Sequence, residues 1–290
     1  MPPGALAYDE PMAHPLLSSP AWTAALLAVA ALVGCAASGP PADAPVARRA
    51  MALLPADALL VGEQHDAPEH QAIEREMVEA LAARGHLAAL AIEMAEEGSS
   101  TAHLDPGATE AQVQTALGWN EAAWPWSAYG PTVMAAVRAR VPVLGANLPR
   151  ARMKDAMADV SLDAQLGAQA LQAQQASVRE GHCRLLPESQ IGPMTRVQIA
   201  RDRAMAQTLL KARVPGKTVL LVSGAGHGAK ALGVPQHLPS DLAVKTVQLQ
   251  AGAASSPPRE PGAFDAVWQT SPLPEKDYCT TLRAQARPPN

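Results

Sequence analysis

The chain has no long run of lysine or arginine, and its 290 residues carry a net charge of −4. Binding to a nucleic-acid backbone requires clustered positive charge, so nucleic acid is excluded as the expected partner. No segment is repeated along the chain, so nothing indicates a repeat architecture. Apolar residues make up 48% of the composition, which is enough to bury one large core. A single α/β domain is therefore the expected organisation.

The apolar run near the N-terminus, residues 22–33, is too short to cross a bilayer as a helix, which takes about 20 residues. It ends in Leu-Val-Gly-Cys at 32–35, which resembles the lipobox of bacterial lipoproteins. We therefore predict that residues 1–34 are a signal peptide and that Cys35 is lipidated and becomes the first residue of the mature chain. No Lys or Arg precedes the run, whether translation starts at Met1 or at Met12.

The segment 35–45 is rich in Ala, Gly and Pro and is predicted to be a tether. This composition argues against the alternative interpretation of the apolar run, which is a buried core helix. If Cys35 carries lipid, Cys183 and Cys279 are the cysteines that remain, and in an oxidising compartment we expect them to form a disulfide bond. The alternative is two unrelated buried thiols.

Two apolar stretches of strand length, residues 58–62 and 87–92, enclose a helical pattern. Asp66 is expected to be the N-cap of this helix, with Glu69 at capping-box spacing, and the helix is expected to end at Arg84. Its buried stripe is predicted to consist of Ile73, Met77 and Leu81. A strand, a helix and a second strand in this order form a right-handed crossover between parallel strands.

The same alternation continues along the chain. Further strands are predicted at 141–144, 218–223, 243–250 and, at an edge of the sheet, 265–269. Further helices are predicted at 46–54, 110–117, 131–140, 162–179 and 195–211. The predicted fold class is α/β: a mainly parallel central sheet flanked by helices, with an inserted helical subdomain. Residues 46–290 are expected to form one domain, with helical insertions at about 95–140 and 150–211.

Polar side chains follow four of the predicted strands. Glu63 and His65 follow the first strand, Glu93 the second, Asn147 the third and His227 the fourth. Ligands bind beyond the carboxyl ends of parallel strands, so we expect these side chains to converge. Two histidines with carboxylates suit either a divalent ion held by His65, Glu93 and His227, or acid and base catalysis without a metal.

Each of these residues taken singly has an ordinary structural explanation, such as a bond to a loop or a helix end. Their repetition at one end of successive strands favours a joint site. His70, near the start of the first helix, either faces this site or is solvated. The glycine-rich segment 224–228 is not a nucleotide-binding fingerprint, because no helical pattern follows it.

A set of motifs, in order along nearly the whole mature chain, carries a family resemblance. The motifs are Gly-Glu-Gln-His-Asp at 62–66, Ala-Ile-Glu-Met at 91–94, the tryptophan-rich segment 119–131, and residues 141–150, 182–183, 198–206, 223–238 and 277–279. Together they resemble the ChaN-like haem-binding lipoprotein family. That family is part of a superfamily with the Tiki metalloproteases and the erythromycin-esterase-like hydrolases.

The resemblance implies a lipid-anchored protein on the periplasmic side of the outer membrane of a Gram-negative bacterium, with a role in haem binding or iron uptake. Such family members hold haem through a tyrosinate, with two haems enclosed by a homodimer. Through the matching motifs, Tyr129 is the candidate haem ligand. The other cofactor-binding candidates are His65, His227, Asn147 and Arg150, with Arg150 placed to pair with a haem propionate.

The superfamily hydrolases use a Gly-x-x-His motif, a Glu and a distal His, and Glu63, His65, Glu93 and His227 fall on that pattern. Two functions therefore stay open. The first is a lipid-anchored envelope protein that binds haem in haem or iron acquisition. The second is an esterase or peptidase, metal-dependent or based on His and Glu, in which these residues activate water to attack a carbonyl.

Overall fold

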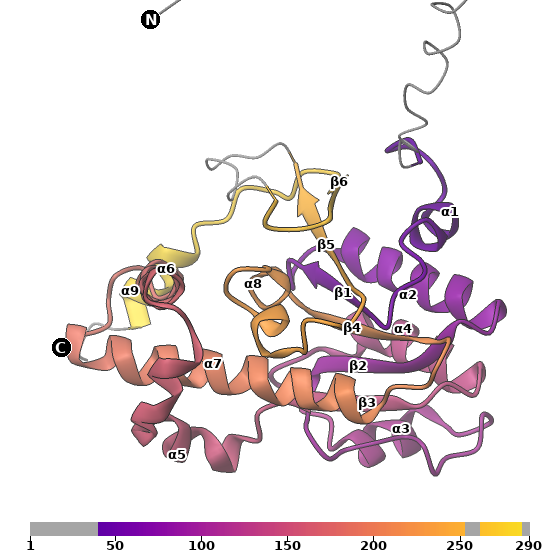
Figure 1. The fold of residues 1–290 in the computed structure, drawn as a ribbon, viewed down its shortest axis with the longest axis horizontal. Helices are drawn as coiled ribbons and strands as arrows, with labels where there is room; N and C mark the ends of the chain where they lie inside the picture. The colour runs from indigo at the N-terminus through magenta and orange to yellow at the C-terminus, as the bar shows by residue number, and fades with distance from the viewer. Residues whose placement is uncertain (1–39, 253–261, 286–290) are drawn as a thin grey trace, which may run out of the picture. The chain divides into compact units, whose positions relative to one another are not determined.

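The structure is a computed structural model that describes residues 40–252 and 262–285 (Figure 1). The predicted signal peptide, the lipidation site Cys35 and both possible start residues lie outside the described residues. Within the described part of the chain, no helix is long and apolar enough to span a membrane.

The described residues form one six-stranded sheet in the order β3-β2-β4-β1-β5-β6, and every neighbouring pair is parallel. The strands are β1 (Ala58–Glu63), β2 (Leu87–Glu96), β3 (Val143–Asn147), β4 (Thr218–Gly224), β5 (Val244–Ala251) and β6 (Ala266–Thr270). The predicted α/β class with a parallel central sheet is confirmed. Because β1 lies beside β4, the segments that carry Glu63 and His227 leave the sheet next to each other.

Helices cover both faces of the sheet (Figure 1). One face packs against α1 (Val46–Met51), α2 (Pro68–Ala83), α3 (Glu110–Leu117) and α4 (Trp126–Arg138), and the other against α7 (Glu188–Lys211) and the 3-10 turn η3 (Val234–His237). In β1, Leu59 and Val61 belong to the first core, whereas Ala58 and Leu60 belong to the second. Burial on both faces explains why the first predicted strand is a continuous apolar run.

A helical subdomain extends from the sheet, as predicted. Its elements are η1 (Arg150–Arg152), α5 (Met153–Ala158), η2 (Val160–Gln165), α6 (Ala168–Gly181) and the first part of α7. These elements share a separate small core made of Leu148, Ala156, Leu162, Leu166, Ile199 and Ala204. In Figure 1 the subdomain lies at the left of the sheet.

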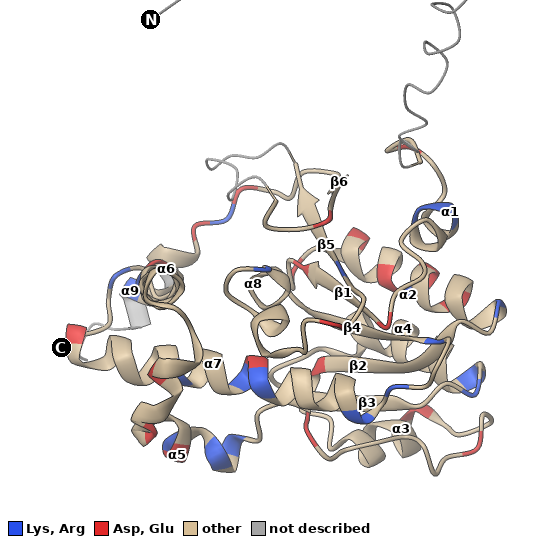
Figure 2. Cartoon of the chain, in the orientation of Figure 1, with Lys and Arg blue, Asp and Glu red and all other residues tan. Residues whose placement is uncertain are grey.

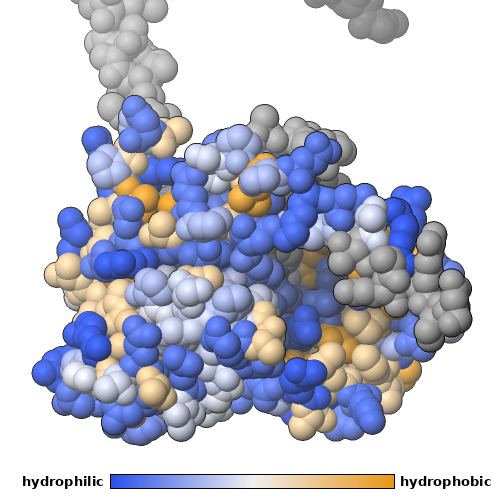
Figure 3. Space-filling model, turned by 180° about the vertical axis from the view of Figure 1, so that it is seen from behind, coloured by the Kyte–Doolittle hydropathy of each residue, from blue (hydrophilic) through white to orange (hydrophobic). Residues whose placement is uncertain are grey.

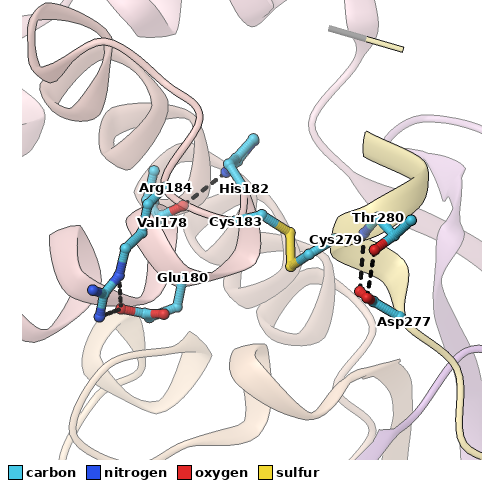
Figure 4. The surroundings of a disulfide bond; sticks show 8 residues. All are labelled: Val178, Glu180, His182, Cys183, Arg184, Asp277, Cys279 and Thr280. Atoms are coloured by element: carbon cyan, nitrogen blue, oxygen red, sulfur yellow. Dashed lines mark hydrogen bonds and ion pairs between the residues drawn. A yellow bond between two sulfur atoms is a disulfide. The ribbon is translucent and has the colours of Figure 1, made fainter. Parts of the chain in front are cut away.

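A disulfide bond joins Cys183, just after α6, to Cys279 in α9 (Tyr278–Gln285), and so confirms the predicted pairing (Figure 4). Asp277, at the start of α9, accepts a hydrogen bond from the backbone N–H of Thr280. The residues between β6 and α9 have no regular structure. The disulfide therefore fastens the C-terminal helix to the subdomain.

The structure corrects the predicted starts of two helices. The helix predicted from 131 begins at Trp126 and contains Pro131, and the helix predicted from 195 begins at Glu188 and contains Pro193. Each proline removes one backbone hydrogen bond from the second turn of its helix, but packing compensates for this loss. In α4 the indole of Trp126 lies against Gly130, where an added Cβ would come within 2.5 Å of Nε1.

Other boundaries also differ from the prediction. The helix predicted at 162–179 is two elements, η2 and α6, because the chain is extended at Leu166 and Gly167. The short helix α5 was not predicted, β2 continues to Glu96, and β3 begins at Val143.

Asp66 is not the N-cap of α2, so that prediction is wrong. The N-cap is Ala67, which is extended and makes no side-chain capping bond. Asp66 instead accepts a hydrogen bond from the hydroxyl of Tyr278, and Glu69 accepts one from the backbone N–H of Ser271. Both acids thus bind the C-terminal segment of the described chain, which no local pattern indicates.

Every buried residue of the hydrophobic clusters lies between Ala50 and Trp268. Residues 40–252 and 262–285 also belong to one compact unit. Seen from behind, the surface is mostly hydrophilic, with hydrophobic residues in small groups (Figure 3). A chain that begins at Ala36 therefore keeps the whole core, and we expect it to fold on its own.

Candidate functional site

Glu63 ends β1 and is buried at the carboxyl edge of the sheet. The hydroxyl of Tyr129 and Nδ1 of His65 each donate to its Oε1 at 2.9 Å, and Nε2 of Gln71 donates to its Oε2 at 3.0 Å. Three donors on one buried carboxylate match the needs of an ionised acid. Glu63 is therefore the fixed point that orients His65 and Tyr129.

His65 is the most accessible member of this group, with 39% of its side chain exposed. Its Nε2 lies 3.8 Å from Oε2 of Glu93, and its ring meets Trp124 edge-on with the ring centroids 4.8 Å apart. Burial lowers the pKa of His65, but the hydrogen bond to Glu63 and the charges of Glu93 and Glu63 outweigh burial, so the pKa is raised. Because Glu63 accepts the proton on Nδ1, Nε2 is the nitrogen that can exchange a proton with a ligand.

Glu93 is a buried residue of β2 that lies between two histidines. Its Oε2 accepts the backbone N–H of Gly224 at 2.8 Å, and its Oε1 lies 3.4 Å from Nε2 of His227. Burial favours the neutral acid, yet the charges of His227 and His65 hold the pKa of Glu93 well below its usual range. Position 224 requires glycine, because a Cβ there would lie 2.9 Å from Nε2 of His65.

His227 lies in the short helix α8 (Ala225–Gly228), between Glu93 and Asp202 of α7. Its Nδ1 is 2.6 Å from Oδ1 of Asp202. Burial lowers the pKa of His227, but the charges of Glu93 and Asp202 outweigh burial and raise the pKa to about 10. His227 is therefore a cation at neutral pH that pairs with two buried acids.

These contacts form one series across the sheet edge, in which acids and histidines alternate. The order is Asp202, His227, Glu93, His65, Glu63 and Tyr129. The structure thus brings together Glu63, His65, Glu93 and His227 from three different strand ends. Their chemical roles stay predictions.

Tyr129, the haem ligand expected from the sequence, is 4% exposed and donates its hydroxyl proton to Glu63. Burial and the neighbouring charge of Glu63 raise the pKa of Tyr129 far above its usual range. This environment favours a neutral phenol that holds Glu63 in place. The assignment of Tyr129 as a ligand stays a prediction.

Glu74, on α2, was missed by the sequence analysis. Its side chain is fully buried, and within the described residues neither carboxyl oxygen has a hydrogen-bond partner. Burial raises the pKa of Glu74 well above its usual value, and the charge of Glu63 adds to the effect. The site therefore contains a buried acid whose neutral form is favoured, close to the hydrogen-bonded Glu63.

The C-terminal segment packs against Asp66, the residue that follows His65. Tyr278 is 50% exposed, and its hydroxyl donates to Asp66, the residue that follows His65. This bond raises the pKa of Tyr278. Nζ of Lys276 lies 3.9 Å from Oδ2 of Asp66 and 4.9 Å from the ring centroid of Tyr278. An accessible phenol and a cation thus lie beside Asp66, the residue that follows His65 in the chain.

His70 is neither solvated nor part of the series. It is fully buried, its Nδ1 accepts the backbone N–H of Gln64 at 3.0 Å, and its Nε2 lies 2.9 Å from Oγ1 of Thr270. Burial lowers the pKa of His70. The residue therefore links α2 to β6 as a neutral structural side chain.

Asn147 and Arg150 lie farther along the sheet edge. Oδ1 of Asn147 is buried and has no hydrogen-bond partner in the described part of the chain. Arg150 is exposed, and its backbone N–H donates to Oε1 of Glu96. No hydrogen bond or ion pair between described residues joins either one to His65. Their predicted place in the cofactor site stays a prediction.

Across residues 40–252 and 262–285, no group of three or more His, Cys, Asp or Glu side chains is arranged to hold a metal ion. Instead, His65 and His227 both direct Nε2 to Glu93, at 3.8 and 3.4 Å. The donor atoms of the predicted metal site therefore pair with one another. A divalent ion on these three residues stays a hypothesis.

Two buried acids of the site, Asp202 and Glu74, were not predicted, although their positions in the sequence indicate burial. Asp202 lies on the same stripe of α7 as the buried Ile199 and Met205. Glu74 lies on the stripe of α2 marked by Ile73 and Met77. An acid on the apolar stripe of an amphipathic helix is a sign of a buried polar site.

The chain is similar to known haem-binding proteins in sequence and in fold. The model of the family described as "Haem-binding uptake, Tiki superfamily, ChaN" matches residues 50–238. The fold resembles the solved structure of ChaN of Campylobacter jejuni, which is described by its cofacial haem binding. The two structures superpose with a TM-score of 0.58 and 24% sequence identity. The match covers 70% of this chain and 85% of that one.

Two bacterial effectors are more distant in structure. The type III effector HopBA1 has a TM-score of 0.46 and 15% identity, over 81% of this chain and 98% of its own. RRSP, a MARTX toxin effector domain from Vibrio vulnificus CMCP6, has a TM-score of 0.40 and 11% identity, over 71% and 36%. No curated protein matches the chain.

Proposed function

Because this chain belongs to the ChaN family of haem-binding uptake proteins in the Tiki superfamily, we propose that it binds haem and serves in haem or iron acquisition. The observation that carries the proposal is the family match, which extends over the strands and helices that build the His65 site. The accessible side chains at that site also suit haem, which needs an iron ligand, apolar contact and a cation for its propionates.

Four side chains, on or close to the segment 63–66, suit these needs. The phenol of Tyr278 is half exposed, and the imidazole of His65 is the accessible end of the buried series. Trp124 packs edge-on against His65 and offers an aromatic wall. Lys276, beside Tyr278, is the candidate cation for a propionate. We therefore propose Tyr278 as the iron ligand in preference to the buried Tyr129, with His65 as a second candidate.

We further propose the location that the sequence indicates, which is the periplasmic side of the outer membrane of a Gram-negative bacterium, with a lipid anchor on Cys35. The disulfide between Cys183 and Cys279 is compatible with an oxidising compartment. A homodimer around the haem is part of the same proposal. Labelling with a radioactive fatty acid, lost in a Cys35→Ser variant, tests the anchor.

Hemin titration of the chain that begins at Ala36 tests the central proposal. A saturable shift of the Soret band, together with light scattering that reports a dimer on loading, is the expected result. A spectrum that stays that of free hemin at every protein concentration excludes haem binding.

A specific observation favours hydrolysis as a second candidate. Glu63 binds Nδ1 of His65, while Nε2 faces Glu93 and solvent. An accessible imidazole oriented by a buried carboxylate is the arrangement of a general base, so water held near Nε2 would be activated to attack an ester or amide carbonyl. His227 would then act through Glu93, by fixing its charge and position.

Turnover of a panel of esters and peptides tests this second candidate. His65→Ala should abolish activity, and Gln71→Ala should reduce it by loosening Glu63. Equal activity of the wild type and His65→Ala would exclude the site. Removal of divalent ions with a chelator separates the metal-dependent form of the mechanism from the form based on His and Glu.

A further inference from the structure

Exposed basic residues gather at the amino ends of the strands, the opposite end of the sheet from the His65 site. In Figure 2 they appear in blue on α1 and on the loops at the right-hand end of the sheet. They lie in α1 or in the few residues that precede β2, β3 and β4. The six are Arg48, Arg84, Arg138, Arg140, Arg213 and Lys217, and all are exposed.

Few acids balance this group, which we call the basic end. Near it lie Asp57, Asp105 and Asp241, and of these Asp57 forms an ion pair with a member of the group, Arg213, at 3.8 Å. The chain as a whole has more acids than bases, with a net charge of −4. The positive charge at this end is therefore a local feature that runs against the overall composition.

Helix termini explain only part of this arrangement. Arg84 donates to the carbonyl of Ala80 at 3.1 Å, and Arg138 donates to the carbonyl of Ala108 at 2.8 Å. The first of these bonds is common at the carboxyl end of a helix, whereas Ala108 lies in the loop that precedes α3. The two bonds involve no carboxylate, so the charges are not neutralised. Arg140 and Lys217 have no side-chain hydrogen bond or ion pair with any described residue.

The basic end also presents apolar groups. Val214, in the loop between α7 and β4, is 43% exposed. A recess of about 510 Å³ opens at the same end, and its lining includes Met51, Leu54, Pro55, Asp57, Gly216 and Lys217. Basic side chains around a small apolar centre are typical of a surface that meets the headgroup region of a membrane.

The path of the chain also indicates that the basic end lies near the membrane. The N-terminal helix α1 supplies one wall of the recess through Met51, so the polypeptide enters the folded body at the basic end. The residues between Cys35 and Val46 span at most about 40 Å when fully extended. A lipid on Cys35 would thus keep this end close to the bilayer.

We propose that the basic end is a docking surface for anionic phospholipid headgroups, with Val214 at its apolar centre. This inference rests on the lipid anchor in the proposed function for its orientation, but its chemistry does not require haem binding. Docking in this way directs the carboxyl ends of the strands, with His65 and Tyr278, away from the bilayer. The haem site is then open to a partner or a ligand that arrives from the aqueous side.

Flotation of the chain that begins at Ala36 with lipid vesicles tests the proposal without the anchor. We expect binding to vesicles that contain phosphatidylglycerol, weak binding to pure phosphatidylcholine, and loss of binding in high salt. The variant Arg48→Gln, Arg140→Gln, Lys217→Gln should weaken binding by about tenfold or more. Val214→Ser should weaken it by a smaller factor.

The matched control is Arg152→Gln, Lys154→Gln, Arg184→Gln, which removes three exposed charges from the subdomain. The proposal is overturned if this control weakens vesicle binding as much as the basic-end variant does. It is also overturned if phosphatidylcholine binds equally well, or if a short DNA duplex binds more tightly than the anionic vesicles. Far-UV circular dichroism and urea unfolding show whether each variant remains folded, whether or not the protein binds haem, and a separate Soret titration of the wild type tests the haem proposal.

Discussion

Nδ1 of His227 lies 2.6 Å from Oδ1 of Asp202, and both side chains are almost entirely buried. The histidine follows β4 in the short helix α8, and the acid comes from the middle of α7, so this bond ties the sheet edge to the helix that covers it. Because Nε2 of the same ring faces Glu93, one imidazolium pairs with two buried acids. The accessible His65 depends on this arrangement.

Removal of the His227 cation should lower the free energy of unfolding. His227→Ala leaves Glu93 and Asp202 as buried acids without their partner, and breaking a buried pair in this way costs about 3 to 5 kcal/mol. Urea unfolding at pH 7 measures the loss. A control, Lys230→Ala, removes an exposed positive charge from the same region and should cost below about 1 kcal/mol. Equal losses in the two variants would contradict the role given to His227.

The same pair predicts a pH dependence. The pKa of His227 is about 10 in the folded protein and ordinarily 6.5, so its stabilisation is complete below about pH 6.5 and is lost progressively as the pH rises to about 10. The free energy of unfolding should therefore fall over this range. In His227→Gln this decline should become shallower, and an unchanged slope would refute the assignment.

Glu74 should oppose stability at neutral pH. Its pKa is raised in the folded state, so the unfolded chain loses the proton first and the free energy of unfolding falls as the pH rises above about 4.5. Glu74→Gln should match the wild type near pH 4 and be more stable than it at pH 8. Glu74→Met, which removes the unpaired polar atoms, should gain about 1 to 3 kcal/mol. A destabilised Gln variant at pH 8 would mean that the ionised acid is needed.

Haem ligation by Tyr278 predicts a contrast between two tyrosine variants. Tyr278→Phe should weaken hemin binding by about tenfold or more, equivalent to about 1.4 kcal/mol, and should move the Soret band. Tyr129→Phe is the matched control and should leave the band in place, because that hydroxyl is buried against Glu63. The opposite pattern would establish Tyr129 as the ligand.

Asp66 should control how readily Tyr278 binds iron. Its hydrogen bond raises the pKa of Tyr278, which disfavours the tyrosinate. Hemin affinity should therefore increase with pH, and Asp66→Asn should bind hemin more tightly than the wild type at pH 7. A Soret titration of the two proteins at pH 6, 7 and 8 measures both effects. Weaker binding by Asp66→Asn at every pH would remove Tyr278 from the proposal.

Loss of the disulfide should affect both stability and binding. The bond spans 96 residues, and for a loop of this size the chain-entropy model gives at most about 4 to 5 kcal/mol. In Cys183→Ser, Cys279→Ser the helix that carries Tyr278 is no longer fastened, so hemin affinity should fall as well. In the chain that begins at Ala36, a reductant should reproduce this phenotype. Unchanged hemin binding would show that α9 needs no covalent support.

The fold and the site could be predicted from the sequence where local patterns and strand order agree. The apolar runs that became β1 and β4 each end at a glycine, and a histidine follows three residues later in both, so the placement of His65 and His227 at one edge could be anticipated. The helix α3 was predicted with its observed bounds. In the structure Thr109 and Gln112 form a capping box at its start, and Gly118 ends it in a left-handed conformation.

The remaining features depend on contacts that no local pattern contains. The prolines in α4 and α7 suggested later starts, but packing extends both helices past them. Asp66 resembled an N-cap until the C-terminal segment supplied Tyr278 as its partner. Asp202 appeared as an ordinary helical acid, and its role requires the position of α8 relative to α7.

The covalent link between Cys183 and Cys279 closes a loop that contains α7, β4, β5 and β6. A single cut of the backbone anywhere between these two cysteines therefore leaves both fragments attached. After limited digestion, the protein should migrate as one species on a non-reducing gel and separate into two pieces once the sulfur bridge is opened.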